Sequence, residues 1–317
     1  MAPLVRTGGS RHTGLAAPPH CNIHLIQRGF CSLANSGLFN SLPDKLYLQL
    51  MYWARTGRRL NLKCPKSFNE KLQWLKLYNH RPEYCKMVDK YEAKKYVASI
   101  IGEQYIIPTL GVWDRFDDID FSKLPNQFVL KCTHDSGGLI ICKDKFKLDI
   151  KEARTIIEKS LKTNYYFHGR EWPYKNVKPR IIAEQYMVSE SGEEIKDYKI
   201  FNFNGKPRLI QVDYDRFIKH KRNLYTTDWK YIEAELEFPT DVNVRIEKPD
   251  RLNEMLLFAT KLSKDIPHVR TDFYFFNEKI YFGELTFFHG SGFEHFMPET
   301  LGVELGKYIN LPIEDSV

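Results

Sequence analysis

The chain has 317 residues, of which 43% are hydrophobic, 14% aromatic and 27% charged, and its formal net charge is +7. This composition is typical of a folded globular protein and excludes a largely disordered chain. No apolar run reaches the roughly eighteen residues of a membrane-spanning helix. The positive charge favours anionic partners such as nucleotides, phosphorylated carriers, nucleic acid or an anionic membrane, although a generic basic surface explains it equally well.

The six cysteines form no CxxC pair and no His/Cys cluster at the spacing of a zinc site. Cys132 and Cys142 fall in apolar stretches, where cysteine behaves as a small hydrophobic side chain. We therefore expect a reducing compartment, without a disulfide framework or a structural metal.

Residues 1–40 differ from the rest of the chain. No acidic residue precedes Asp44, and Arg6, Arg11 and Arg28 occur in a stretch that contains much Gly, Ser, Pro and Ala. A mitochondrial targeting segment has such a composition, with the sequence RGFCS as its processing site. A disordered or over-extended N-terminus of a bacterial protein is the interpretation that we favour, and under either one the segment is excluded from the fold.

Residues 41–122 are predicted to be mainly helical. Asp44 suits the first turn of a helix that ends near Gly57. Ser67 and Glu70 form the signature of a capping box ahead of an apolar periodic run. The predicted elements are helices at residues 43–57, 67–79 and 89–102, followed by a strand at 105–113.

The remainder of the chain alternates strands with amphipathic helices and contains no internal repeat. Asn204-Gly205 predicts a tight hairpin turn, and Asn277-Glu278 predicts a second one. The result is an α+β chain with antiparallel hairpins rather than a regular βαβ series. The predicted elements are a strand–turn–strand unit at residues 126–144, helices at 151–166 and 249–266, and strands at 179–187, 197–215 and 268–288.

The segment VLKCTHDSGG (129–138) is the first candidate for a binding site. It places Lys131 at the end of an apolar strand, with Gly137 and Gly138 a few residues later. The strand fixes the ammonium group, and the glycines let backbone N–H groups approach phosphate oxygens closely. The residue order of a Walker A loop is missing, and a β-hairpin with a glycine turn is the alternative interpretation.

An acidic residue directly after an apolar strand marks the second candidate, IIAEQYM. Glu184 would bond the edge of an adenine or a ribose there, and Gln185 and Tyr186 would offer backbone groups beside it. A strand end that simply reaches solvent is the alternative.

The C-terminal hairpin carries the strongest candidate. Pairing about the turn at Asn277-Glu278 brings Asp272 close to Glu284 on neighbouring strands. Two carboxylates in an aromatic environment repel each other unless a cation lies between them, and carboxylates together with nucleotide phosphates are ligands that Mg²⁺ prefers. Arg270 shares a strand face with Asp272 and can neutralise a developing oxyanion. The alternative is one salt-bridged acid and one solvent-facing acid.

A strand that begins at Asp197-Tyr198-Lys199 is predicted to pair with one that ends at Asp213-Tyr214-Asp215. The basic cluster beyond it would hold the transferred phosphate or an anionic substrate group, unless it is a solvated loop. Asp213-Tyr214-Asp215 also matches the D-x-D pattern with which glycosyltransferases hold a metal against a nucleotide sugar, so this enzyme class is the main alternative. The basic cluster consists of Arg216, Lys219, His220 and Arg222.

Taken in order, these segments resemble the ATP-grasp superfamily, and within it the TupA-like ATP-grasp proteins, named for an enzyme of bacterial teichuronopeptide synthesis. The resemblance covers roughly residues 41–310. It implies an α+β ATP-grasp fold in which lobes at 123–187 and 188–317 hold the nucleotide between them, after a helical region at 41–122. The motifs that carry it are SFNEKLQWLKLY, DKYEAKKYV, LKCTHDSGG, AEQYM, DYKIFNFNGKP and RTDFYFFNEKIYFGELTFF.

The resemblance also implies roles for individual residues. Those placed at the nucleotide are Lys131, Ser136, Gly137, Gly138, Glu184, Gln185, Tyr186 and Lys199. Those placed at the metal are Asp272, Glu284 and Thr286, and those assigned to catalysis are Arg270, Lys199 and Arg216. Because Thr286 stands where many ATP-grasp enzymes carry asparagine, we expect one magnesium ion rather than two.

By this resemblance the reaction is carboxylate activation: ATP phosphorylates a carboxylate, and an amine attacks the acyl phosphate. The expected partners are ATP, Mg²⁺, an amino acid or other amine, and a uronic acid or similar group of a bacterial cell-surface polysaccharide; no nucleic acid is expected. A sugar kinase with the same ATP site is a further alternative. The expected location is the bacterial cytoplasm, with peripheral association to a membrane-linked glycan, or the mitochondrion if residues 1–40 are a transit peptide.

Overall fold

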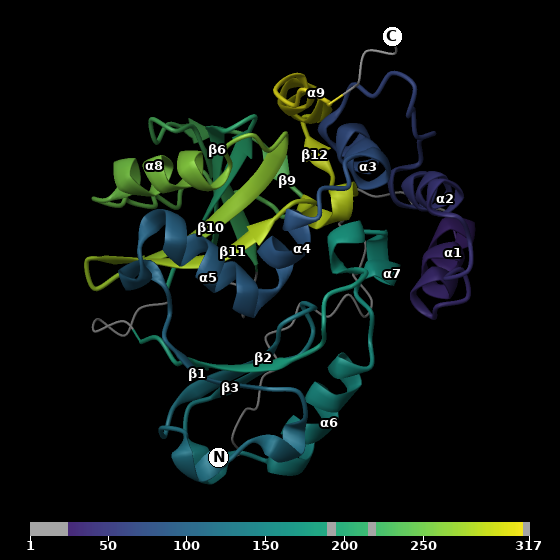
Figure 1. Cartoon of the computed structure of the whole chain (residues 1–317). Helices are drawn as coiled ribbons and strands as arrows, with labels where there is room; N and C mark the ends of the chain where they lie inside the picture. The colour runs from purple at the N-terminus through teal and green to yellow at the C-terminus, as the bar shows by residue number, and fades with distance from the viewer. Residues whose placement is uncertain (1–24, 189–194, 215–219, 313–317) are drawn as a thin grey trace. The chain divides into compact units, whose positions relative to one another are not determined.

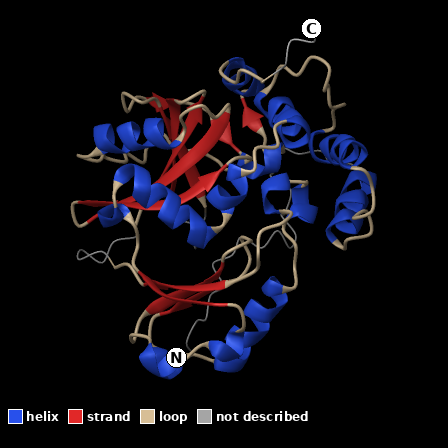
Figure 2. Ribbon diagram, viewed as in Figure 1, coloured by secondary structure: helices blue, strands red, loops and turns tan. Residues whose placement is uncertain are grey.

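The computed structural model describes residues 25–188, 195–214 and 220–312, which form two compact units (Figures 1 and 2). The smaller unit contains residues 82–166 and 173–188. The larger unit contains residues 25–81, 167–172, 195–214 and 220–312. Along this described part of the chain, no helix is long and apolar enough to cross a membrane.

The described residues of the smaller unit include an antiparallel sheet with the strand order β1-β4-β2-β3. The helices and strands of this unit include α4 (Glu83–Val88), α5 (Lys90–Ile101), β1 (Thr109–Trp113), β2 (Phe128–Cys132), β3 (Leu139–Cys142), α6 (Ile150–Leu161) and β4 (Ile181–Gln185). One face of the sheet packs on α6, as Figure 1 shows, through side chains such as Phe128, Leu130 and Ala183. Because side chains alternate along a strand, Lys131 and Glu184 lie on the opposite face.

Helix boundaries in the smaller unit follow the capping residues. The carboxylate of Asp89 accepts hydrogen bonds from two backbone N–H groups in the first turn of α5, and Asp149 caps α6 in the same way. Helix α5 ends at Ile101 and is followed by Gly102, whose φ of 111° is a backbone conformation that favours glycine. The buried face of α5 includes Lys94 beside Val97, so the cap at Asp89 also fixes where this lysine enters the unit.

The larger unit has, over the residues that the structure describes, an antiparallel sheet with the order β11-β10-β5-β6-β7-β8, and a second sheet of β12 and β9. The turns at Asn204-Gly205 and Asn277-Glu278 have positive φ at both residues, as tight hairpins require. The strands are β5 (Asp197–Phe203), β6 (Lys206–Tyr214), β7 (Lys221–Tyr225), β8 (Tyr231–Ile232), β9 (Glu235–Leu236), β10 (His268–Phe276), β11 (Lys279–Thr286) and β12 (Phe296–Met297).

Helix α8 (Leu252–Leu262) covers one face of this sheet by packing on β5, β6 and β10. Phe273 lies on that face, where its ring contacts Phe258 of α8. The neighbouring residues Arg270 and Asp272 therefore lie on the opposite face. The other helices of the unit are α1 (Leu25–Asn35), α2 (Asp44–Thr56), α3 (Phe68–Tyr78), α7 (Tyr166–Gly169, whose first residue belongs to the smaller unit) and α9 (Glu299–Lys307).

The fold begins earlier than the sequence indicated. Of the excluded segment, residues 1–24 lie outside the described part, but α1 is formed and packs against α2, with Ala34 buried beside Tyr47 and Leu48. The RGFCS sequence lies within α1. The expected helical region at 41–122 is also divided differently, because α2 and α3 belong to the larger unit and α4 and α5 to the smaller one.

Candidate active site

A buried carboxylate between two lysines forms the polar centre of the smaller unit. Glu184 on β4 is 5% exposed; its Oε1 lies 2.5 Å from Nζ of Lys94 and its Oε2 lies 2.5 Å from Nζ of Lys131. Lys94 also donates a hydrogen bond of 2.9 Å to the hydroxyl of Thr109. Glu184 thus faces two ammonium groups rather than an open strand end, and its predicted contact with adenine stays a prediction.

The two lysines control the protonation of Glu184. Burial raises the pKa of this carboxyl, but Lys131 and Lys94 outweigh burial and lower the pKa to about 2. Burial in turn lowers the pKa of Lys94. The side chain of Lys131 remains 28% exposed, against 9% for Lys94. Lys131 is therefore the cation of this group that an anionic ligand can reach.

Sequence reasoning assigned no role to Lys94. The signal was its position on α5, where Ala93, Val97 and Ile101 repeat every four residues along the buried face. A lysine on that face must find a buried counter-charge, because an unpaired ammonium group is costly to bury. The identity of that counter-charge, a strand residue ninety positions later, required the fold.

The turn between β2 and β3 is held by Asp135. Its carboxylate accepts hydrogen bonds from the hydroxyl of Ser160 and from the backbone N–H of Gly138, the latter at 3.3 Å. A Cβ on Gly138 would collide with the side chains of Ser160 and Cys132, whereas one on Gly137 would have room. Gly138 is thus required by packing inside the unit. Gly137 and Ser136 are the exposed positions at which a ligand can approach the backbone.

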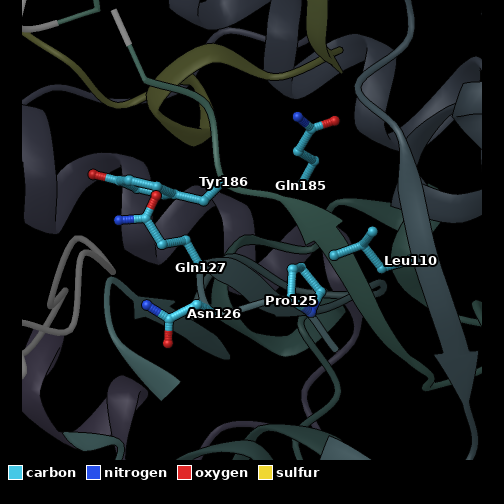
Figure 3. A pocket seen from close by; sticks show the side chains of 6 residues that line it. All are labelled: Leu110, Pro125, Asn126, Gln127, Gln185 and Tyr186. Carbon is cyan, nitrogen blue, oxygen red and sulfur yellow. The ribbon is translucent and has the colours of Figure 1, made fainter. Parts of the chain in front are cut away.

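Gln185 and Tyr186 line an open pocket of about 530 Å³ at the end of β4 (Figure 3). The backbone N–H of Gln185 donates to the carbonyl of Pro108 at 3.0 Å. This donor is therefore engaged within the protein, and the prediction that Gln185 and Tyr186 offer backbone groups to a nucleotide stays a prediction. The other residues around the pocket are Leu110, Pro125, Asn126 and Gln127.

In the larger unit, a β-bulge brings Glu284 to Asp272. Thr271 pairs with Leu285 and Phe273 pairs with Phe282, so two residues of β11 lie opposite Asp272 alone. Such a bulge re-aims the side chains of the longer strand. The pairing about the Asn277-Glu278 turn is as predicted, whereas the bulge was not.

The cation between these acids is a guanidinium group. Nη2 of Arg270 donates to Oδ2 of Asp272 at 2.8 Å and to Oε1 of Glu284 at 2.9 Å. The same nitrogen donates to the hydroxyl of Thr286 at 3.0 Å, while Nε donates to Oδ1 of Asp272 at 2.7 Å. One arginine therefore contacts all three predicted metal ligands and screens the repulsion between the two carboxylates.

Lys199 supplies a second cation on this face of the sheet. It lies opposite Asp272 on β5 and donates to Asp272 Oδ2 at 2.9 Å and to Asp197. Burial raises the pKa of Asp272 to about 6, although Arg270 and Lys199 both lower it. Lys199 is itself buried, so in this structure it balances two acids.

The sequence of this chain also matches a known protein family. The model of the TupA-like ATPgrasp family matches residues 70–310. The chain belongs to this family. Its fold is therefore ATP-grasp, as the sequence motifs predicted, and the match begins within α3 rather than near residue 41. No curated protein matches the chain.

Solved structures of ligases are similar to this TupA-like ATPgrasp protein at low identity. D-alanine–D-alanine ligase from Bacillus anthracis, complexed with ATP, is 16% identical over 63% of this chain and 53% of that one, with a TM-score of 0.38. The D-alanine–D-alanine ligase from Helicobacter pylori is 12% identical over 77% of this chain and 70% of that one, with a TM-score of 0.40. Phosphoribosylamine–glycine ligase from Thermotoga maritima is 11% identical over 64% of this chain and 48% of that one, with a TM-score of 0.40. The match thus spans about half of the Bacillus anthracis ligase.

The oxygen donors of the TupA-like site fit a magnesium ion only in part. Two carboxylates and a hydroxyl are ligands of the kind that Mg²⁺ prefers. Among the described residues, however, no group of three or more His, Cys, Asp or Glu side chains is placed to hold a metal. Asp272, Glu284 and Thr286 would therefore need further oxygen ligands from outside the chain, which phosphate groups and water provide.

The remaining candidates separate into buried and undescribed residues. Asp213, the first acid of the D-x-D pattern, is buried and accepts hydrogen bonds from Arg222 at 2.7 Å and from Gln211 at 3.0 Å. Its carboxylate is occupied by protein donors, which counts against a metal-binding D-x-D motif. Asp215 and Arg216 lie outside the described residues.

Proposed function

We propose that this protein is an ATP- and Mg²⁺-dependent carboxylate–amine ligase that acts through an acyl phosphate. The observation that carries the proposal is Arg270, held by Asp272 and Glu284 in a chain of the ATPgrasp family. Glu284 is half exposed, so its carboxylate is the part of this group that solvent can reach. A buried arginine beside two acids provides positive charge at a fixed place, which phosphoryl transfer needs.

Each group of charges has a part in this chemistry. Lys131 would neutralise phosphate oxygens of ATP, and Glu184 keeps its ammonium group in place. Arg270 would stabilise the charge that develops as the phosphoryl group passes to the carboxylate. Asp272, Glu284 and Thr286 would hold Mg²⁺, which supplies Lewis-acid stabilisation of phosphate oxygens when bound. Catalysis would thus consist mainly of positioning and charge neutralisation.

The amine needs no dedicated base if it enters the reaction neutral, and we assign none. After the amine attacks the acyl carbon, the carbon–oxygen bond to phosphate breaks, and the amine proton leaves with water or phosphate. Lys199, the lysine nearest to this group, is already paired with Asp272 and Asp197. The chain therefore contributes binding and orientation to this step.

The finer proposal concerns the substrates. The resemblance to the TupA-like family supports an amino acid joined to a uronic acid, or a similar group, of a bacterial cell-surface polysaccharide or its precursor. The net charge of +7 is consistent with an anionic glycan and with ATP. We place the reaction in the bacterial cytoplasm, with peripheral association to a membrane-linked glycan.

An ADP-release screen of uronic acids against amino acids, with mass spectrometry of the products, tests the proposal. The expected result is ADP release that requires both a carboxylate and an amine, with an amide as product. A phosphorylated sugar without an amide would instead indicate a kinase. Stabilisation against thermal unfolding by a UDP-sugar but not by Mg·ATP would refute the proposal and support a glycosyltransferase.

A further inference from the structure

We infer that His289 and Glu294 are positioning residues that hold the guanidinium of Arg270 in the orientation needed for phosphoryl transfer. The inference rests on the proposed function, because it assigns Arg270 to that step. Neither residue belongs to the groups predicted from the sequence. Both follow the acid Glu284 in the chain, His289 in a short helical turn (His289–Gly292) and Glu294 just after it.

The geometry links the two residues to the edge of Arg270 that faces away from the acids. Nδ1 of His289 lies 2.5 Å from Nη1 of Arg270. On the other side of the imidazole ring, Nε2 lies 2.6 Å from Oε2 of Glu294. The guanidinium is thus held on two edges, by His289 through Nη1 and by the acids through Nη2 and Nε.

The hydrogen bond to Arg270 determines the protonation state of His289. Arginine stays protonated in proteins, so Nη1 must be the donor and Nδ1 of His289 the acceptor. Nε2 then carries the proton of a neutral imidazole and lies beside the carboxylate of Glu294. Burial lowers the pKa of His289 to about 4, against the raising effect of Glu294. The ring is therefore neutral, and a charged ring could not accept from Arg270.

Glu294 is itself anchored, which makes the arrangement rigid. Arg222 on β7 donates to Oε2 of Glu294 at 3.1 Å, to Asp213 at 2.7 Å and to the carbonyl of Leu236 at 2.8 Å. Burial raises the pKa of Glu294, but His289 and Arg222 outweigh it and lower the pKa to about 2. Glu294 is thus ionised and fixed to strands β6 and β7 through Arg222, and it in turn holds His289 against Arg270.

The consequence is specific to the orientation of Arg270. Asp272 and Glu284 fix the plane of the guanidinium only through Nε and Nη2. A ligand that draws Glu284 away removes one of these contacts, and His289 then keeps Nη1 in place. Loss of one hydrogen bond to a charged group is worth about a 10- to 100-fold change in an equilibrium or a rate.

The test compares three variants of His289 in the full chain. His289→Asn keeps an acceptor near the place of Nδ1, His289→Gln moves the amide toward the place of Nε2, and His289→Leu removes both. With the carboxylate–amine pair found in the ADP-release screen, we expect ADP formation from Mg·ATP to fall about 10- to 100-fold in the Leu and Gln variants, with the KM for ATP within about 3-fold. The Asn variant should regain most of the rate. Equal losses in all three variants, in step with thermal stability, would overturn the inference.

A readout that needs no turnover separates this inference from the proposed function. In nitrogen-15 spectra of arginine-labelled protein, assigned with Arg270→Lys, rotation about the Cζ–Nη1 bond of Arg270 should accelerate about 10-fold or more in His289→Leu and His289→Gln, but not in His289→Asn. Unchanged rotation in all variants would refute the positioning role. If the wild type forms no ADP with any acceptor pair, the proposed function fails while the spectra still decide this inference.

His268 provides the matched control. It is also buried, lies on β10 two residues before Arg270, and its Nδ1 lies 2.9 Å from the carbonyl of Asn202. His268→Leu removes a buried imidazole of the same neighbourhood without removing a contact to Arg270. This variant should lower thermal stability and leave the Arg270 signals unchanged. A comparable change in those signals would show that the effect of His289 is general packing.

Discussion

Replacing Glu184 by glutamine should lower the free energy of unfolding by about 3 kcal/mol at pH 7, and this loss should shrink as the pH falls. The carboxyl has an ordinary pKa of 4.5 and a pKa of about 2 in the folded protein. Each pH unit between these values is worth about 1.4 kcal/mol. Because the folded pKa is the lower one, the stabilisation is complete above pH 4.5 and is lost as the pH falls toward 2.

Urea unfolding of the wild type and of Glu184→Gln, at pH 7 and at pH 3, measures this dependence. The free energy of unfolding of the wild type should exceed that of Glu184→Gln by about 3 kcal/mol at pH 7 and by about 1 kcal/mol at pH 3. Glu158→Gln is the matched control in the same unit, because Glu158 forms an exposed pair with Arg154 worth under about 0.5 kcal/mol. A Glu184→Gln variant as stable as the wild type at pH 7, or a gap that does not change with pH, would refute the reasoning.

Three further predictions follow from the two groups of charges and the turn. Lys131→Ala should weaken ATP binding about 10- to 100-fold in calorimetry, and an unchanged affinity would remove Lys131 from the phosphate site. Glu284→Gln should reduce Mg²⁺-dependent ATP turnover on the order of 100-fold or more while unfolding at nearly the wild-type temperature; full turnover would contradict the metal assignment. Gly138→Ala should cost about 1–3 kcal/mol in urea unfolding through overpacking, and Gly137→Ala under about 0.5; equal effects would contradict the packing role of Gly138.

Local features of the fold were predictable because their causes are local. The capping box of Ser67 and Glu70 marks the start of α3, and the observed hydrogen bonds are those of a capping box. Asn204-Gly205 forms the turn that its conformational preference predicts. The pairing of the two strands that carry Asp272 and Glu284 followed from the second hairpin turn, whereas the bulge that brings the two side chains together did not. Family and fold could also be predicted, because the motifs and their order can be read directly from the sequence without knowledge of contacts between them.

The rest of the site depends on contacts between distant segments. Glu184 was predicted to bond an adenine or a ribose, since nothing near it in the sequence shows that Lys94 contacts it from a helix ninety residues earlier. The cation between Asp272 and Glu284 was expected to be a metal, whereas Arg270 contacts both. The role of Gly138 in packing required knowledge of α6. In each case the sequence identified the chemical group but not its partner.

The most direct test of the central claim uses a carboxylate substrate labelled with oxygen-18, once the ADP-release screen has identified one. If Arg270, Asp272 and Glu284 support carboxylate activation, the carboxylate oxygen attacks the γ-phosphorus of ATP and remains on phosphorus when the amine displaces phosphate. Mass spectrometry should then find one labelled oxygen in the released phosphate and an amide as the other product. Unlabelled phosphate, or ADP formation without an amide, would contradict the account.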